Sequence, residues 1–403
     1  MVNPIRSIRA YNAGRDPERL AIKFKAMRQD AFVFLRGTCH LFYERLPEVS
    51  GAGVLKRAPL TWVCGDLHLQ NFGSYKGDNR LVYFDINDFD EGALAPCTWD
   101  LVRFLTSVLV GGKTLGVKPA QALSLCRTLL DAYALALMSG KARWVERETA
   151  EGLVRELLTG LQTRKRHELL ERRTEIKKGK RHIRLDGKHA LRIGNKQREQ
   201  ISAFMRDYAR TQSDPGFYKV LDIANRVAGT GSLGIERYVI LVEGKGSPDG
   251  NYLLDLKEAL GSSLLPHRKV RQLRVDSKAH QVVAVQRRMQ AISMAFLQPV
   301  VIGKKSYVMR GLQPTEDRVA LDHWNGNLQR LEGVVNVMGK IVAWAQLRSG
   351  GRDGSATIDE LIAFGQERKW RKRLLAVARA CAAQVEGDWR TFAEAYDAGK
   401  FNN

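Results

Sequence analysis

The sequence predicts an α+β protein with two lobes, a larger helical lobe and a small lobe built on an antiparallel β-sheet. The first observation is length, since 403 residues exceed what one hydrophobic core usually serves. The second is apolar residues at helical spacing towards both ends of the chain. The third is a central stretch of β-type runs joined by glycine-rich turns. We therefore expect a shared cleft and four segments: 1–60 (N-terminal helices), 61–210 (helical lobe), 211–315 (sheet lobe) and 316–403 (helices returning to the helical lobe).

The first sixty residues are predicted to be helical. Ala21–Met27 and Ala31–Leu46 carry apolar side chains at helical spacing, and Pro47 ends the second run.

A short strand is predicted at Leu60–Val63, with Leu81–Ile86 as its hairpin partner across the turn at Gly77. Three helices follow in the same lobe. A basic segment and one more helix then lead towards the sheet lobe. These four helices are expected at Trp99–Val110, Pro119–Met138, Trp144–Leu161 and Gln197–Arg210.

From residue 218 the pattern changes to β-type runs. Three of them, separated by glycine-rich turns, are predicted strands: Tyr218–Ala228, Glu236–Glu243 and Tyr252–Glu258. Ser277–Phe296 is predicted to be the one long helix of this lobe, and Val300–Gly311 to form one or two more strands. Residues from Leu328 onward are predicted to be helical, with the helix Leu331–Leu347 ending at the glycine stop of Gly350.

The chain is strongly basic, with a formal net charge of +22 at pH 7. Such a field attracts anions in general, including nucleic acid, anionic lipid headgroups and nucleotides, and it selects none of them. Much of the excess lies in segment 164–198, where arginines and lysines have few acids to offset them. A solvated helix pair and loop is the favoured interpretation. A nucleic-acid surface is the alternative, although this segment offers no aromatic residue for base stacking.

The cysteines and the hydropathy pattern indicate a cytoplasmic protein. No apolar stretch approaches the roughly 20 residues that cross a bilayer, and no apolar signal core follows the charged N-terminus. The absence of a Cys-x-x-Cys pair argues against a disulfide framework and against a zinc site. Reduced, mostly buried thiols are therefore expected at Cys39, Cys64, Cys97, Cys126 and Cys381.

The first half of a candidate site lies at residues 65–71, which read Gly-Asp-Leu-His-Leu-Gln-Asn at the end of a predicted strand. Asp66 can accept a proton from a substrate hydroxyl, or orient that hydroxyl. Asn71 can supply an amide oxygen to a magnesium ion, and His68 is expected to brace the loop by hydrogen bonds rather than to bind metal.

The next predicted strand ends in a dense group of acids and amides. Carboxylates are the hard oxygen ligands that magnesium prefers. Like charges crowded at a strand end are costly without a cation, and packing does not require such density. The sequence therefore predicts a metal site within the group Asp85, Asn87, Asp88, Asp90 and Glu91, although Asp90 and Glu91 taken alone are better explained as turn residues or solvated caps.

The second half of the site is a glycine loop between two predicted strands, formed by Gly229, Thr230, Gly231, Ser232 and Gly234. In that position the loop is expected to cover nucleotide phosphates rather than to open a helix. Glycine has no side chain, so backbone amides can approach an anion closely. The motif alone is a weak signal, and a flexible turn is the alternative.

Lys257 ends the third predicted strand in an apolar context, where its ammonium group can neutralise the α- and β-phosphates of a nucleotide. Asp255 shares its face by two-residue alternation, so an exposed ion pair between the two is the alternative. Kinase-like sites usually have a glutamate on the following helix to orient the lysine, yet residues 277–296 contain no acid. Either the lysine is positioned differently, or its partner is one of Gln286, Gln290, Glu258 and Glu243.

Together these segments resemble a bacterial family called domain of unknown function 2252. The acidic half is also similar to the catalytic and metal loops of aminoglycoside and choline phosphotransferases, which carry a Gly-Asp-x-His-x-x-Asn signature and then an aspartate-phenylalanine step. The family resemblance covers most of the chain, at residues 32–37, 65–73, 84–91, 229–234 and 256–259.

The resemblance implies an ATP- and magnesium-dependent phosphotransferase with a two-lobed, protein-kinase-like fold, acting on a small hydroxylated molecule or, less favoured, on a protein. Asp66 and Lys257 would be catalytic and Asn71 a metal ligand. The second metal ligand is left open: spacing from Asp66 favours Asp85, and the aspartate-phenylalanine step favours Asp88. The acidic half precedes the glycine loop, so the implied fold is circularly permuted, with the helix 331–347 in place of the helix that normally leads into the catalytic loop.

Two other function classes are weighed against this one. A metallophosphatase would hold paired metals with histidines and aspartates, and the remaining histidines show no matching strand-end pattern. A non-catalytic alternative is a nucleotide-binding pseudokinase, or a nucleic-acid-binding protein that uses segment 164–198. The acceptor substrate is not encoded in the motifs, because acceptor pockets are built by variable helices and loops.

Overall fold

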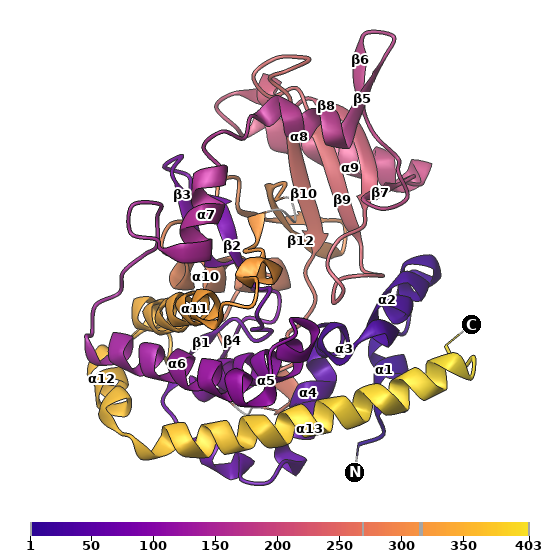
Figure 1. The fold of residues 1–403 in the computed structure, drawn as a ribbon. Coiled ribbons are helices and arrows are strands. Elements are labelled where there is room, and N and C mark those ends of the chain that lie inside the picture. Colours follow the sequence, from indigo (N-terminus) through magenta and orange to yellow (C-terminus); the bar gives the residue numbers. More distant parts are fainter. Residues whose placement is uncertain (1, 268–269, 314–316, 402–403) are drawn as a thin grey trace.

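A computed structural model describes residues 2–267, 270–313 and 317–401 and shows a mixed α and β protein with one large antiparallel sheet (Figure 1). The sheet has six strands in the order β11-β12-β10-β9-β8-β7, and every neighbouring pair is antiparallel. The strands predicted between residues 218 and 311 are confirmed. They are β8 (Val220–Arg226), β9 (Arg237–Val242), β10 (Tyr252–Glu258), β11 (Gln298–Ile302) and β12 (Lys305–Gly311), and β7 (Ala190–Leu191) adds an edge strand.

The two faces of the sheet are covered by different elements, because side chains alternate along each strand. On one face, Ile240 and Leu254 pack in a cluster with Ile201 of α9 (Asn195–Arg210). On the other face, Leu253 packs in a cluster with Leu170 of α8 (Arg166–Arg173). Both helices thus belong to the core of the sheet lobe, whereas the predicted division after residue 210 assigns them to the helical lobe.

The basic segment 164–198 is not the helix pair and loop that its sequence suggested. It contains α8, the hairpin of β5 (Thr174–Lys177) and β6 (Lys180–Ile183), β7 and the start of α9. Most of its arginine and lysine side chains are exposed. Its buried apolar residues Leu170, Ile183 and Ala190 nevertheless pack against the sheet, so the segment covers part of that sheet as well as forming a charged surface.

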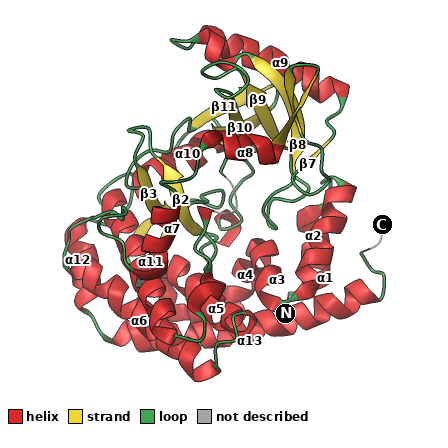
Figure 2. Ribbon diagram, turned by 45° about the horizontal axis from the view of Figure 1, so that its top comes forward, coloured by secondary structure: helices red, strands yellow, loops and turns green. Residues whose placement is uncertain are grey.

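The helical lobe is built around four long helices: α5 (Thr98–Thr114), α6 (Pro119–Met138), α11 (Leu328–Ser349) and α13 (Lys369–Asp397). Figure 2 shows these helices gathered below the strands of the sheet lobe, and α13 runs along the base of the molecule in Figure 1. The helices predicted at 99–110, 119–138 and from 328 onward are confirmed, with α12 (Ile358–Gln366) as an additional short helix. Tyr133 of α6 donates a hydrogen bond to Gln346 of α11 inside this core.

The N-terminal segment forms α1 (Pro4–Asn12), α2 (Pro17–Gln29), α3 (Ala31–Gly37) and α4 (Cys39–Arg45), and α1 to α3 pack against α13. The helical run predicted over 31–46 is divided between α3 and α4. The backbone leaves helical geometry at Thr38, with φ −131° and ψ 46°. Its hydroxyl donates to the carbonyl oxygen of Phe34 at 2.7 Å and closes the end of α3.

The short strands of the helical lobe pair differently from the prediction. β1 (Leu60–Val63) pairs with β4 (Ala93–Pro96) and not with residues 81–86. β3 (Val82–Ile86) pairs with β2 (Phe72–Lys76), so the turn at Gly77 joins two strands that are neighbours in sequence. β2 contains Gly73, which weakens a strand pattern and hides this strand in the sequence.

Two helices are shorter than predicted. α7 (Gly152–Gly160) starts later than Trp144, and α10 (Lys278–Met289) ends before Phe296. No helix in the described part of the chain is long and apolar enough to cross a membrane. All five cysteines are free thiols and buried.

The crossing of α6 and α11 yields a first prediction. A Cβ on Gly339 of α11 would lie 2.5 Å from the carbonyl oxygen of Leu129 in α6. Overpacking of this kind costs about 1–3 kcal/mol. We expect Gly339→Ala to lower the free energy of unfolding by about that amount in urea denaturation.

Gly333→Ala is the matched control, because an added Cβ at that position of the same helix meets nothing within 4 Å. It should raise the free energy of unfolding by about 0.5–1 kcal/mol through helix propensity. Equal stabilities of the two variants would contradict the close crossing.

Candidate functional site

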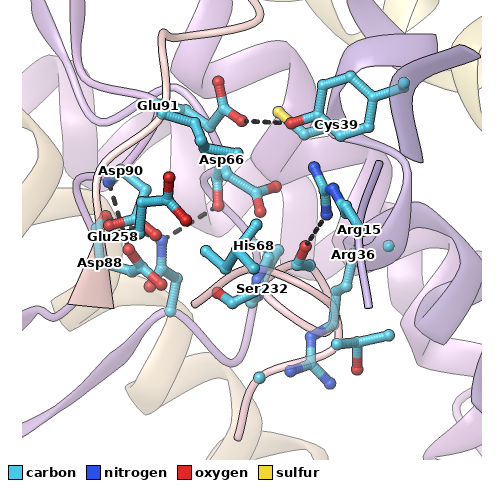
Figure 3. A pocket seen from close by; sticks show the side chains of 18 of the residues that line it. Arg15, Arg36, Cys39, Asp66, His68, Asp88, Asp90, Glu91, Ser232 and Glu258 are labelled. Atoms are coloured by element: carbon cyan, nitrogen blue, oxygen red, sulfur yellow. Dashed lines mark hydrogen bonds between the residues drawn. The ribbon is translucent and has the colours of Figure 1, made fainter. Parts of the chain in front are cut away.

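Residues from both predicted halves of the site line one cavity (Figure 3). The acidic half contributes Asp66, Asn71 and Asp88, and the glycine loop contributes residues 229–232. Other parts of the wall come from the N-terminal helices and from the segment after β12. Among those additional lining residues are Tyr11, Arg15, Arg36, Cys39 and Arg318.

A buried aspartate holds the loop that carries Asp66. Asp100, in the first turn of α5, accepts hydrogen bonds from the amides of Cys64 and Gly65, each at 2.9 Å. Burial raises the pKa of Asp100 to about 6, although these amides favour its ionised form. Gly65 has φ +83°, and a Cβ there would lie 2.3 Å from the carbonyl oxygen of Glu91. The backbone before Asp66 is therefore fixed from two sides.

Asp66 is held through one of its two oxygens. Its Oδ1 accepts hydrogen bonds from Nε of Arg103, at 2.8 Å, and from Nη2 of the same residue. Arg103 is fully buried in α5 and also donates to the carbonyl oxygen of Leu35 at 2.9 Å. Burial raises the pKa of Asp66, and the ion pair with Arg103 offsets this only in part. Oδ2 has no hydrogen-bond partner among the described residues, so the carboxylate can act on a group in the cavity.

Asn71 links the two loops of the acidic half. Its Nδ2 donates to the carbonyl oxygens of Asp66 and Asp88 at 3.1 and 3.3 Å, which leaves its Oδ1 available as an acceptor or ligand. His68 accepts a hydrogen bond on Nδ1 from the amide of Gln70 at 3.1 Å. Burial lowers the pKa of His68 well below its usual range, so the ring braces the loop in its neutral form.

Lys257 reaches from β10 to the loop that follows β3. Its Nζ lies 3.5 Å from Oδ2 of Asp88 and forms an ion pair with Asp90. Burial disfavours the ionised form of Asp88, but Lys257 and two nearby arginines outweigh it and lower the pKa of Asp88 to about 2. Asp88 and Asp90 therefore pair with Lys257 in place of the glutamate or glutamine that the sequence led us to expect. The other candidates bond elsewhere: Glu243 to Ser247, Glu258 to Lys305, Gln286 to Gln290 and Gln290 to Ile86.

The two candidates for the second metal ligand lie in different surroundings. Asp88 lines the cavity, whereas Asp85 is buried in the helical lobe. Oδ2 of Asp85 accepts from the amide of Ala291 at 3.0 Å and lies 3.2 Å from Nη2 of Arg348. Asp85 thus ties β3 to the end of α10 and to α11, and Asp88 is the one that can reach a ligand in the cavity.

The glycine loop joins β8 to β9 and packs against the N-terminal helices. Arg15 donates to the carbonyl oxygens of Gly231 and Leu233 at 3.2 and 3.5 Å. Gly234, with φ +90°, accepts from the amide of Asp16 at 3.1 Å and lies outside the cavity lining. The amides of Thr230 and Gly231 make no hydrogen bond within the described part of the chain, so both can serve an anion.

Asp255 shares a sheet face with Lys257 but is not its partner. Asp255 is fully buried among three arginines: Arg237 at 2.6 Å, Arg226 at 2.7 Å and Arg310 at 3.4 Å. The alternative of an exposed pair between Asp255 and Lys257 is wrong, because both side chains are buried. One carboxylate among three guanidinium groups leaves a surplus of positive charge beside the cavity.

A magnesium site in this cavity would have few protein ligands. The described residues contain no group of three or more His, Cys, Asp or Glu side chains suited to a metal ion. Magnesium is commonly held by one or two carboxylates together with water and substrate phosphates. Asp88 and Oδ1 of Asn71 fit that smaller set, provided that an anionic ligand completes it.

Four arginine and aspartate residues that shape the site were not identified from the sequence. Asp100 and Arg103 are three positions apart on a predicted helix, so their common face could have linked them to the loop of Asp66. Arg36 stands inside one of the family-like segments, without a motif that marks it. Arg318 lies in an irregular segment, and the sequence carries no signal for it.

The chain matches, over residues 15–395, the family described as "Uncharacterized protein conserved in bacteria (DUF2252)", and it belongs to this family. The family resemblance seen in the sequence is therefore confirmed. No match was found among curated proteins or among solved structures. The matched stretch includes both the acidic half of the site and the glycine loop.

The tight contact at Gly65 gives a second prediction. A left-handed backbone costs a non-glycine residue about 1–2 kcal/mol, and overlap with a backbone carbonyl adds about 1–3 kcal/mol. Gly65→Ala should therefore lower the free energy of unfolding by about 2–5 kcal/mol in urea denaturation. Gly116→Ala is the control, since Gly116 has φ +71° and nothing within 4 Å of an added Cβ. It should show the backbone cost alone, and an equal loss in both variants would speak against the contact with Glu91.

The pKa of Asp88 gives a third prediction. Because it lies at about 2 in the folded protein, below the unfolded value near 3.8, ionised Asp88 stabilises the fold above pH 4. That contribution is lost as the pH falls towards 2. The side chain is 43% exposed, so solvent screening limits the effect to about 1 kcal/mol.

Asp88→Asn should consequently lose less stability than the wild type between pH 5 and pH 2.5, as measured by urea denaturation at each pH. The control is Asp276→Asn, which removes an exposed carboxylate outside the cavity and should follow the wild-type pH profile. Parallel profiles of all three proteins would show that Asp88 is not held in its ionised form.

Proposed function

We propose that this member of the bacterial family is an ATP- and magnesium-dependent phosphotransferase that acts on a hydroxylated acceptor, a small molecule in preference to a protein. The proposal depends on one observation above all: Lys257 meets Asp88 and Asp90 at the cavity that also contains Asp66. A lysine on a sheet, a glycine loop and an aspartate-asparagine pair are the parts with which kinase-like enzymes bind a nucleotide and orient a hydroxyl.

The proposal includes a kinase-like fold with a permuted chain order. The glycine loop between β8 and β9, the lysine on β10 and the helix α10 after it follow one another as in a nucleotide-binding lobe. The helix α11 packs beside β1, the strand that leads into the loop of Asp66. In this reading α11 replaces the helix that would normally run directly into that loop.

The nucleotide phosphates are placed between the glycine loop and the acidic half. The free amides of Thr230 and Gly231 line that space as donors, and the ammonium group of Lys257 does not line it but pairs with Asp88 and Asp90, which do. The arginine surplus around Asp255 favours a polyanion there. Asp88 and Asn71 are the residues that would hold magnesium, which supplies charge neutralisation of the phosphates when bound.

A second cavity offers room for the base and ribose. Its volume is about 290 Å³, and it adjoins the first cavity at Gly229 and Thr230. Val239, Leu253 and Leu312 give it an apolar wall. Leu253 and Lys257 lie on the same face of β10, because they are four residues apart in a strand. A nucleotide with its base in the second cavity therefore directs its phosphates along this face towards Lys257.

Asp66 is the proposed proton acceptor. The acceptor oxygen attacks the γ-phosphorus, the bond from that phosphorus to the bridging oxygen of ADP breaks, and the hydroxyl proton passes to Oδ2 of Asp66. Arg103 holds Oδ1 and so fixes the orientation of the carboxylate. The burial that raises the pKa of Asp66 makes it a better proton acceptor than an exposed aspartate.

Nucleotide binding and transfer provide the test. Magnesium with ATP should raise the melting temperature, since a ligand at 100 times its Kd stabilises the folded state by about 2.7 kcal/mol. Asp66→Asn should keep this shift and lose about 10²–10⁴-fold in the rate of ATP-dependent phosphorylation, measured over a panel of hydroxylated small molecules. Lys257→Met should lose most of the shift relative to its own nucleotide-free melting temperature.

The control is Lys219→Met, which removes an exposed lysine at the start of the same sheet. It should keep the full shift. A shift without turnover on any acceptor would favour the non-catalytic nucleotide-binding alternative, and no shift with ATP, ADP or GTP in the wild type would refute the proposal.

A further inference from the structure

Two arginines of the cavity, Arg36 on α3 and Arg318 after β12, have no counter-ion among the described residues. Neither forms an ion pair with any residue that the structure describes, and Nε of Arg36 is buried without a hydrogen bond. Burial lowers the pKa of Arg36 to about 10 and also lowers that of Arg318. A partly buried cation without a partner is costly, so these two guanidinium groups favour an anion between them.

The carboxylates of the same cavity do not meet this demand, because each is engaged elsewhere. Asp66 pairs with Arg103, and Asp88 and Asp90 pair with Lys257. Glu91 accepts two hydrogen bonds from Ser263. In Figure 3 Glu91 and the guanidinium group of Arg36 lie at opposite ends of the view. The cavity thus has an acidic end, whose carboxylates each have a partner, and a basic end, whose two guanidinium groups have no ion-pair partner among the described residues.

Arg36 and Arg318 come from segments that contact the elements around Asp66. Arg103, which holds Asp66, also binds the carbonyl oxygen of Leu35, the residue before Arg36. Arg318 forms an antiparallel bridge with Gly73 at the start of the β2–β3 hairpin. Lys257 and the glycine loop belong to the sheet lobe, although the loop approaches the backbone of Arg36: a Cβ on Gly231 would lie 3.2 Å from the carbonyl oxygen of Arg36. The two unpaired arginines therefore border the space where a hydroxyl must lie to reach Asp66.

We propose that Arg36 and Arg318 form a second anion site, separate from the nucleotide clamp, that binds a phosphate or carboxylate group of the acceptor. This inference rests on the proposed phosphotransferase function and specifies its substrate class. The acceptor is a small hydroxyl compound that is itself negatively charged. Guanidinium groups suit both kinds of anion, because their planar donor pairs match phosphate and carboxylate oxygens.

The site can be tested with inorganic phosphate as the probe. Phosphate is titrated by calorimetry into protein saturated with magnesium and ADP, so that the nucleotide clamp is already filled. We expect wild-type protein to bind phosphate, and Arg36→Gln and Arg318→Gln each to raise the Kd for phosphate at least tenfold. The Kd for magnesium-ADP should stay within twofold. Arg172→Gln, which removes an exposed arginine of α8 outside the cavity, should change neither constant.

Two outcomes overturn the second anion site. One is a wild-type protein that does not bind phosphate with or without nucleotide. The other is a loss of magnesium-ADP affinity in the arginine variants as large as the loss for phosphate, since the two arginines would then belong to the nucleotide clamp. If Arg36→Gln does not fold, the Kd values for phosphate and for magnesium-ADP are compared in Arg36→Lys and Arg318→Gln instead.

Activity on acceptors provides the second arm. Phosphorylated and carboxylated sugars and polyols are compared with their neutral and amino-substituted counterparts. Turnover confined to the anionic compounds, and weakened through KM in Arg318→Gln, supports the proposal, whereas turnover confined to neutral or cationic compounds overturns it. Failure of the phosphotransferase proposal is recognised separately, as no binding of magnesium-ADP or as no turnover on any acceptor. In both cases the phosphate titration without nucleotide still decides the anion site.

Discussion

The contact of Lys257 with Asp88 and Asp90 is the interaction on which the rest of the cavity depends. The lysine comes from the sheet lobe and the aspartates from a loop of the helical lobe, and the lysine side chain is almost fully buried. A buried ammonium group must be paired, and separating it from its partners is expensive. This requirement brings the glycine loop over the loop of Asp66, so that two segments far apart in sequence share one space. A nucleotide that binds there must exchange part of this ion pairing for contacts with its own phosphates and metal.

Charge balance around that contact explains why the site suits anions. Asp255 compensates only one of the three arginines that surround it, and Arg36 and Arg318 have no carboxylate partner among the described residues. The aspartates nearest to the cavity are already engaged with Lys257 or Arg103. The site therefore carries a local positive surplus at defined positions. This surplus is more informative than the net charge of the whole chain, which attracts anions without selecting any.

The sequence predicted the elements of the fold better than their partners. Strands β8, β9 and β10 and helices α5, α6 and α11 follow from residue spacing, which is a local property. The pairing of β1 with β4 depends on a strand returning thirty residues later, and local patterns do not contain that information. In the site, Asp66, Asn71 and the glycine loop were identified because each belongs to a short motif. Arg103, Arg36 and Arg318 were not identified, because the fold and not a short motif brings them to the cavity.

The ambiguity between Asp85 and Asp88 shows why spacing alone could not assign this site. Both residues follow the same apolar strand, and both are acids that suit a metal. The strand β3 ends between them, and the chain then turns towards the cavity. Asp85 therefore has a structural role, whereas Asp88, three positions later, lies at the cavity. Asp85 forms an ion pair with Arg348 and accepts a hydrogen bond from the amide of Ala291. These contacts fix the end of α10 against the helical lobe. That anchoring leaves Asp88 as the acid free to face Lys257, and the geometry at the cavity thus depends on a carboxylate outside it.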